Sequence, residues 1–212
     1  MCEPASMVVI KENGGYQVFW SKNSDSHEVI KEENSLEKLD VENVRGDYRM
    51  IPVEITPPDN DFRLPLDQWK FRAEVTPEWA NLEDVEVACR IALKDWLAAN
   101  VILPEQVVDE ANKYYAAICG TVNHITGGTV NYIRGGTVND ITGGTVNYIT
   151  GGTVNDIRGG TVNYYRGKIP TKITGHTTII NYGSLTPDIL KSSKAVMIDR
   201  SSNTIKCFIG TD

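Results

Sequence analysis

The sequence has few cysteines, no excess of basic residues and no long apolar run. Its four cysteines, at positions 2, 89, 119 and 207, form no Cys-x-x-Cys pair. This excludes the common zinc spacings and indicates no disulfide framework. The net charge of −7 argues against a nucleic-acid partner. Nothing approaches the roughly 18 apolar residues of a transmembrane helix, and no signal-peptide pattern is present, so we expect a cytoplasmic protein with no membrane partner.

The motifs of several large enzyme classes are also missing. The sequence contains no phosphate-binding loop, dinucleotide fingerprint, zinc-protease helix or serine-hydrolase elbow. The Gly-Gly pairs of its repeats are spaced as turns between strands. No lysine follows them, so they are not phosphate-binding loops. The sequence therefore predicts no cofactor and no metal site.

The centre of the chain contains six near-identical octapeptides. They run without a gap from Gly120 to Gly167 and read GTVNHITG, GTVNYIRG, GTVNDITG, GTVNYITG, GTVNDIRG and GTVNYYRG. Thr, Val and Asn are invariant at places two to four, and only the last octad lacks Ile at place six. Near-exact tandem units of this kind are typical of stacked repeats.

Three arrangements of these octads compete: a single-chain β-solenoid, an antiparallel meander with Gly-Gly hairpins, and an intertwined trimer. Place five carries Tyr in every second octad, which favours a coil of two octads or the meander. At place seven, Arg134 is followed by another arginine, Arg158, three octads later. This interval favours three octads per coil. We predict the solenoid. Because Val and Ile have opposite parity on a straight strand, burying both requires a kink near the Asn.

The flanking segments predict an α+β head domain over residues 1–117 and a C-terminal capping hairpin over 184–212, with the all-β repeat region at 118–183 between them. In the head we expect a hairpin turning at Asn13-Gly14, because both residues tolerate positive φ. The expected helices begin at about Ser26, capped by Ser24 or Asp25, at Leu82 and at Pro104. The expected strands are listed by residue number: 7–11, 16–21, 48–56, 69–75, 195–199 and 204–209.

The variable places of the octads supply the first candidate site. Tyr at place five and Arg at place seven would lie on defined faces of a regular array, which suits contact with anionic or aromatic groups. The candidate ligand-binding residues are Tyr132, Tyr148, Tyr164, Arg134, Arg158 and Arg166. They predict a protein that captures a protein or small-molecule partner, and the repeat region could also mediate homo-oligomer formation.

A second candidate site lies at the N-terminus. Removal of Met1 would make Cys2 N-terminal, and its own amino group could then serve as the base for its thiol. Together with Lys22-Asn23-Ser24-Asp25 after the expected hairpin, this opening resembles the cysteine N-terminal-nucleophile hydrolases of the choloylglycine hydrolase and secernin-like group. The resemblance ends at Glu28. It implies an amide hydrolase with Cys2 as nucleophile, Lys22 and Asn23 beside it, Asp25 orienting the amine, and Glu28 as a trailing acid.

The chain as a whole resembles a group of uncharacterised phage-encoded or prophage-encoded proteins with octapeptide repeats. The segments that carry this resemblance are residues 1–6, 20–28, 65–69, the octads and 196–200. It implies the cytoplasm of a bacterial host or the virion as location. Three functions follow: a non-enzymatic binding protein, which we rank first, the amidohydrolase, and a structural virion protein.

Overall fold

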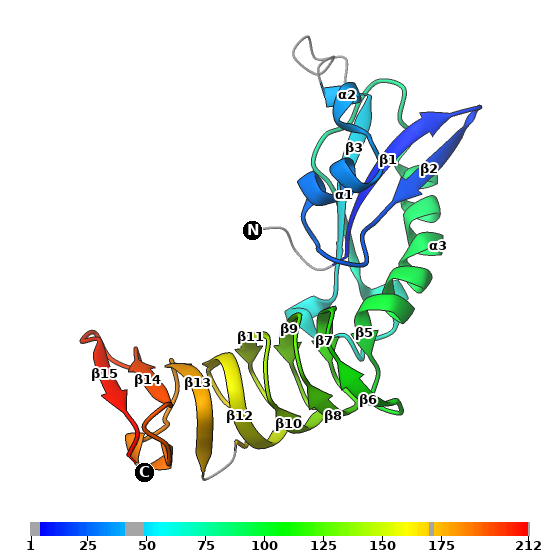
Figure 1. Cartoon of the computed structure of the whole chain (residues 1–212). Coiled ribbons are helices and arrows are strands. Elements are labelled where there is room, and N and C mark those ends of the chain that lie inside the picture. Colours follow the sequence, from blue (N-terminus) through cyan, green and yellow to red (C-terminus); the bar gives the residue numbers. More distant parts are fainter. Residues whose placement is uncertain (1–4, 41–48, 170–171, 212) are drawn as a thin grey trace. The chain divides into compact units, whose positions relative to one another are not determined.

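The computed structural model describes residues 5–40, 49–169 and 172–211. The chain forms two compact units, Met1–Asn100 and Val101–Asp212 (Figure 1). Residues 101–117, which we assigned to the head domain, therefore belong to the unit that contains the octads.

The first unit is built on a four-stranded antiparallel sheet. Its strands are β1 (Ser6–Glu12), β2 (Gly15–Phe19), β3 (Met50–Thr56) and β4 (Lys70–Ala73), in the order β2-β1-β3-β4. The predicted hairpin is present, with Asn13 at φ 51° and Gly14 at φ 81°. Positive φ at both positions matches the twist of the flanking strands, which explains why Asn-Gly joins β1 and β2.

Helices pack on this sheet through apolar stripes. The helical segments are α1 (His27–Glu33), α2 (Glu37–Asp40), α3 (Leu82–Asn100) and two short 3-10 turns, η2 (Pro58–Asn60) and η3 (Leu66–Gln68). As predicted, α3 buries Val85, Cys89, Leu93 and Trp96 at helical spacing. The cap position of α1 is held by Ser26 rather than by Ser24 or Asp25, and the Ser26 side chain makes no capping hydrogen bond. The Ser24 hydroxyl accepts a hydrogen bond from the Ser26 amide just before the helix starts.

The second unit is a parallel β-solenoid with two octads in each coil. One row of strands consists of β6 (Val107–Ala111), β8 (Thr121–Ile125), β10 (Thr137–Ile141) and the first half of β12 (Thr153–Tyr164). The other row contains β5 (Val101–Ile102), β7 (Tyr114–Ile118), β9 (Thr129–Ile133), β11 (Thr145–Ile149) and the second half of β12. We number the octads one to six along the chain. The first row contains octads one, three and five and is called the odd row, and the second contains octads two, four and six and is called the even row.

The strand register decides between the predicted arrangements. Thr137 pairs in parallel with Thr153, and Thr129 with Thr145, so that each Thr meets the Thr of the second octad after its own. The two-octad solenoid is therefore confirmed, whereas the meander, the three-octad coil and the intertwined trimer are wrong. The recurrence of Arg at place seven does not reflect the coil, since Arg134 lies in the even row and Arg158 in the odd row.

The predicted kink explains how one strand buries both Val and Ile. Val138, Ile141, Val146 and Ile149 are all fully buried. In every regular rung the pairing register passes over the Asn between them. The backbone changes direction there, so Asn and the residue after it both point outward while Val and Ile point into the core.

The predicted helix from Pro104 to about Ala117 is wrong. Residues 107–118 form β6 and β7, and Val108 and Ala111 pair with Val122 and Ile125 of the first octad. Stacking on that octad outweighs the helix propensity of the Glu- and Ala-containing segment, since it buries Ala111 in the solenoid core. This segment is a diverged repeat rather than a helix.

The C-terminal end carries the predicted hairpin. After β13 (Ile173–Asn181) and the 3-10 turn η4 (Pro187–Ile189), β14 (Val196–Asp199) pairs in parallel with β13. The last strand, β15 (Lys206–Ile209), is antiparallel to β14. Met197 is buried and Phe208 packs against the solenoid core, so the hairpin covers the end of that core.

Candidate functional site: a tyrosine ladder

Four tyrosines stack along the even row of the solenoid. The ring centroids of Tyr132 and Tyr148 are 5.0 Å apart, those of Tyr148 and Tyr165 are 5.4 Å apart, and those of Tyr165 and Tyr182 are 4.6 Å apart. The parallel register sets this spacing, since Tyr132 pairs directly with Tyr148 in neighbouring rungs. We call Tyr132, Tyr148, Tyr165 and Tyr182 the tyrosine ladder.

Tyr164, which we expected in this row, lies inside the core instead. In the last octad the register shifts, and Tyr164 pairs with Ile149 rather than with Tyr148. In the previous coil two residues, Asn147 and Tyr148, lie between the buried Val146 and Ile149. In the last octad only Asn163 lies between Val162 and Tyr164, so Tyr164 points into the core as Ile149 does. Its hydroxyl donates a hydrogen bond to the Gly167 carbonyl at 3.0 Å. Tyr165 takes the outer position.

The sequence prediction missed two further members of the row, Tyr182 and Arg200. Arg200 lies over the ring of Tyr182, 5.8 Å from its centroid, and its Nη1 lies 3.5 Å from the Tyr182 hydroxyl. The steps from Tyr148 to Tyr165 and from Tyr165 to Tyr182 are each one residue longer than two octads. A search that allows one extra residue per coil would have found both tyrosines.

The stacking determines which part of each ring can meet a partner. Both faces of Tyr148 and Tyr165 are covered by neighbouring rings, and Tyr182 lies between Tyr165 and Arg200. The ladder can therefore present only ring edges and hydroxyls, which excludes face-on stacking along most of its length. Burial raises the pKa of Tyr165, and the neighbouring Tyr182 and Tyr148 raise it further, so its hydroxyl keeps its proton and can donate.

Charge distinguishes the two rows of octads. The even octads contain Arg134 and Arg166 and no acidic residue, whereas the odd octads contain Asp140 and Asp156 with Arg158. Arg166 extends over the previous rung, and its Nε donates to the Thr150 carbonyl at 2.7 Å. Thus Arg134 and Arg166 share a row with the tyrosine ladder, and Arg158 does not. The candidate ligand-binding set is divided between the two rows.

Arg158 forms ion pairs with other side chains of the odd row. Its guanidinium pairs with the buried carboxylate of Asp140, to which Nε donates at 3.1 Å, and it also approaches Asp156 at 3.3 Å. His124 lies on the other side of Asp140, 3.8 Å from it. The hydrogen bond to Asp140, followed by its charge, raises the pKa of Arg158. These contacts join consecutive coils, which is a structural role.

The invariant asparagines form hydrogen-bonded ladders. Asn139 donates to Asn123 at 2.8 Å, and Asn155 donates to Asn139 at 2.9 Å along the odd row. In the even row Asn147 donates to Asn131 at 2.8 Å. Within octads one to five these amides bond to one another between successive coils, so Asn at place four there follows from stacking and requires no ligand.

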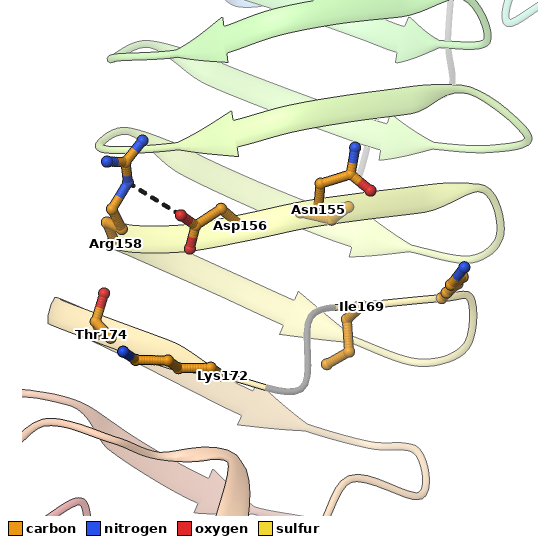
Figure 2. Close-up of a pocket in the computed structure, with 8 residues that line it drawn as sticks. Asn155, Asp156, Arg158, Ile169, Lys172 and Thr174 are labelled. Atoms are coloured by element: carbon orange, nitrogen blue, oxygen red, sulfur yellow. Dashed lines mark ion pairs between the residues drawn. The ribbon is translucent and has the colours of Figure 1, made fainter.

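A cavity of about 550 Å³ opens where the odd row meets the segment after the last octad (Figure 2). Asn155, Asp156 and Arg158 reach it from β12, and Lys172 and Thr174 from the next coil. Val154, Lys168 and Ile169 complete the described lining. Since Arg158 is paired with Asp140 and Asp156, the two lysine ammonium groups are the charges that could hold a small anion here.

The N-terminal residues of the hydrolase prediction are only partly described. Cys2 lies outside the described residues. Lys22 is exposed, the Asn23 amide donates to Glu33 at 2.7 Å, and Asp25 is buried. The exposed Glu28 pairs with the largely buried Lys31 of α1 at 3.0 Å. The bonded Asn23 and Glu28 therefore have structural partners within their own segment.

These features define the class of the protein: a parallel β-solenoid with two octads per coil, joined to a small α+β unit. Comparison with protein-family models, with curated proteins and with solved structures finds no match to this chain. Within residues 5–40, 49–169 and 172–211, no three His, Cys, Asp or Glu residues lie close enough together to hold a metal ion. No helix in that part of the chain is long and apolar enough to cross a membrane.

Proposed function

We propose that this is a phage-type binding protein whose rigid solenoid captures an anionic protein or small-molecule partner along the tyrosine ladder. The observation that carries the proposal is the row of four neighbouring tyrosine rings, stacked at both ends and tilted by 33° between Tyr148 and Tyr165, which repeats a phenol group in successive coils. Phenol hydroxyls donate well to carboxylate, sulfate and phosphate oxygens.

The surroundings of the ladder support an anionic partner over an aromatic or cationic one. Arg134, Arg166 and Arg200 lie along the same row, and the even octads carry no acidic side chain. An aromatic or quaternary ammonium group needs an open ring face, and neighbouring rings cover most of the ring faces of the ladder. A repeated anion, by contrast, can accept from hydroxyl and guanidinium donors in successive coils.

Titration with a fluorescently labelled oligoglutamate tests the proposal, with oligolysine of equal length as the opposite-charge probe. Replacing Tyr132, Tyr148 and Tyr165 with Ser should weaken oligoglutamate binding by about tenfold or more, since each charged hydrogen bond contributes roughly 1.5–3 kcal/mol. Binding should also weaken with added salt.

The control replaces His124, which occupies the same octad place in the odd row and is half-exposed, with Ser. This variant should bind oligoglutamate as the parent does. Equal loss in both variants, or binding of oligolysine in preference to oligoglutamate, would contradict the proposal. Far-UV circular dichroism on each variant separates lost binding from lost folding.

The amidohydrolase remains a second hypothesis, motivated by the Met-Cys opening and the buried Asp25 downstream of it. The intact mass of the purified protein provides a direct test, because an N-terminal nucleophile requires Met1 to be removed. Retained Met1 would exclude this hypothesis and leave the binding proposal unchanged.

A further inference from the structure

We propose that two copies of this chain join through the outer edge of β15, in antiparallel register centred on Cys207. This interface is separate from the tyrosine ladder and does not depend on the proposed function. Three observations on the C-terminal hairpin lead to it: an apolar outer face, a strand edge that pairs with no other described strand, and two isoleucines placed symmetrically about Cys207.

The outer face of the hairpin is apolar. In the antiparallel register Ile209 lies opposite Val196, and Cys207 lies opposite Ile198, so these four side chains share one face. Met197 and Phe208 alternate with them and pack on the core. Ile209 is 68 % exposed and Ile205, the next residue of the same parity, is 62 % exposed. Exposed apolar groups gathered in this way are typical of an interaction surface.

The edge of this strand is open. Among the described residues β15 is the terminal strand of its sheet and pairs only with β14. Its outward amide and carbonyl groups can therefore pair with another strand. Proteins commonly protect such edges with proline, a bulge or repeated lysines, and β15 has a single lysine, Lys206.

The sequence around Cys207 identifies the occupant as a second copy. Residues 205–209 read Ile-Lys-Cys-Phe-Ile, which has Ile at both ends of one face and Cys at its centre. An antiparallel pair centred on Cys207 places Ile205 opposite Ile209 of the second copy, and the reverse. It also places Lys206 opposite Phe208 of the second copy, so no two lysines are directly opposed. Such two-fold self-complementarity is characteristic of an isologous dimer interface.

The central cysteine reports on this register. Directly opposed residues in an antiparallel pair have Cα atoms about 4.5–5.5 Å apart, which is within the range that a disulfide spans. Cys207 is exposed, whereas Cys89 and Cys119 are buried. A Cys2→Ser background removes the remaining thiol, so any crosslink then comes from Cys207. The crosslink is the reporter and is not required for the dimer.

The first experiment measures mass by light scattering over a range of protein concentrations under reducing conditions. We expect a concentration-dependent dimer. Ile205→Lys and Ile209→Lys should each weaken it by about tenfold or more, because each places a charge in the apolar contact. Ile91→Lys is the matched control, since Ile91 is 66 % exposed on α3, and it should leave the dimer unchanged. A chain that stays monomeric at the highest concentration would overturn the proposal.

The second experiment tests the register with diamide, an oxidant that accepts the two protons and two electrons of a forming disulfide. In the Cys2→Ser background the parent should yield a covalent dimer, and adding Cys207→Ser should abolish it. In that cysteine-depleted chain, Ile205→Cys together with Ile209→Cys should restore the dimer. Ile205→Cys alone should not, because its symmetry mate lies roughly 13 Å away along the strand. Equal crosslinking by the single and double variants would rule out this register.

Discussion

Two adjacent glycines in one turn of the solenoid should respond to alanine in opposite ways. Gly151 and Gly152 join β11 to β12, immediately after the rung that carries Tyr148. Gly152 has φ +75°, and a Cβ there would lie 2.3 Å from the Gly136 carbonyl oxygen in the previous coil. A Cβ on Gly151 would lie 3.6 Å from its nearest neighbour, the Gly135 amide nitrogen, which is an ordinary contact.

The magnitudes follow from these distances. Gly152→Ala carries a left-handed backbone cost of about 1–2 kcal/mol and a packing cost of about 1–3 kcal/mol, because the obstructing atom is backbone and cannot rotate away. Gly151→Ala should be neutral or stabilising by about 0.4–1 kcal/mol, since alanine restricts the unfolded chain. We therefore expect the two variants to differ by about 2–6 kcal/mol.

Urea unfolding provides the assay, since the two units can be observed separately. All four tryptophans lie in the first unit, so their fluorescence reports that unit, while tyrosine fluorescence and far-UV circular dichroism include the solenoid. Gly152→Ala should lower the solenoid midpoint by about 2 M relative to Gly151→Ala.

Gly14 separates the two costs of the Gly152 substitution. It has φ +81° in the β1–β2 hairpin, and a Cβ there would meet nothing within 4 Å. Gly14→Ala should therefore be destabilised by the left-handed backbone cost alone, about 1–2 kcal/mol, measured by tryptophan fluorescence. Equal midpoints for Gly151→Ala and Gly152→Ala would refute the reasoning, because they would show that the coils can move apart at little cost.

Two further predictions concern buried ionisable groups. Burial, followed by the charge of Glu86, raises the pKa of Cys89 from 9.0 to about 12. Because the unfolded thiol ionises first, stability should fall by roughly 4 kcal/mol in total as pH rises from about 9 to about 12, measured by urea unfolding at each pH. Asp140→Asn should lower the free energy of unfolding by about 1 kcal/mol in urea, because it weakens the pair with the half-exposed Arg158. Asp156→Asn should lower it by less than about 0.5 kcal/mol, because Asp156 is the more exposed partner of Arg158.

The sequence by itself predicted a stacked repeat and favoured a two-octad coil or the meander, and the parallel register then decided for the coil. Tyr recurs at place five in every second octad, and that interval is the spacing of the paired rungs. The kink at the Asn also followed from local chemistry, because Val and Ile of opposite parity cannot enter one core from a straight strand. The hairpin at Asn13-Gly14 and the apolar stripe of α3 were likewise predictable, since turn type and helical periodicity depend on neighbouring residues alone.

Only the tertiary structure decided the ends of the array and the membership of the site. Residues 107–118 have the local character of a helix and become strands because the first octad offers a sheet edge on which to stack. Tyr164 has the sequence position of a ladder tyrosine and turns inward because the register shifts between Val146 and Ile149. Such a shift depends on the pairing of residues a full coil apart. For that reason Tyr165 and Tyr182 belong to the ladder and Arg200 lies over its last ring, while Tyr164 and Arg158 have structural roles.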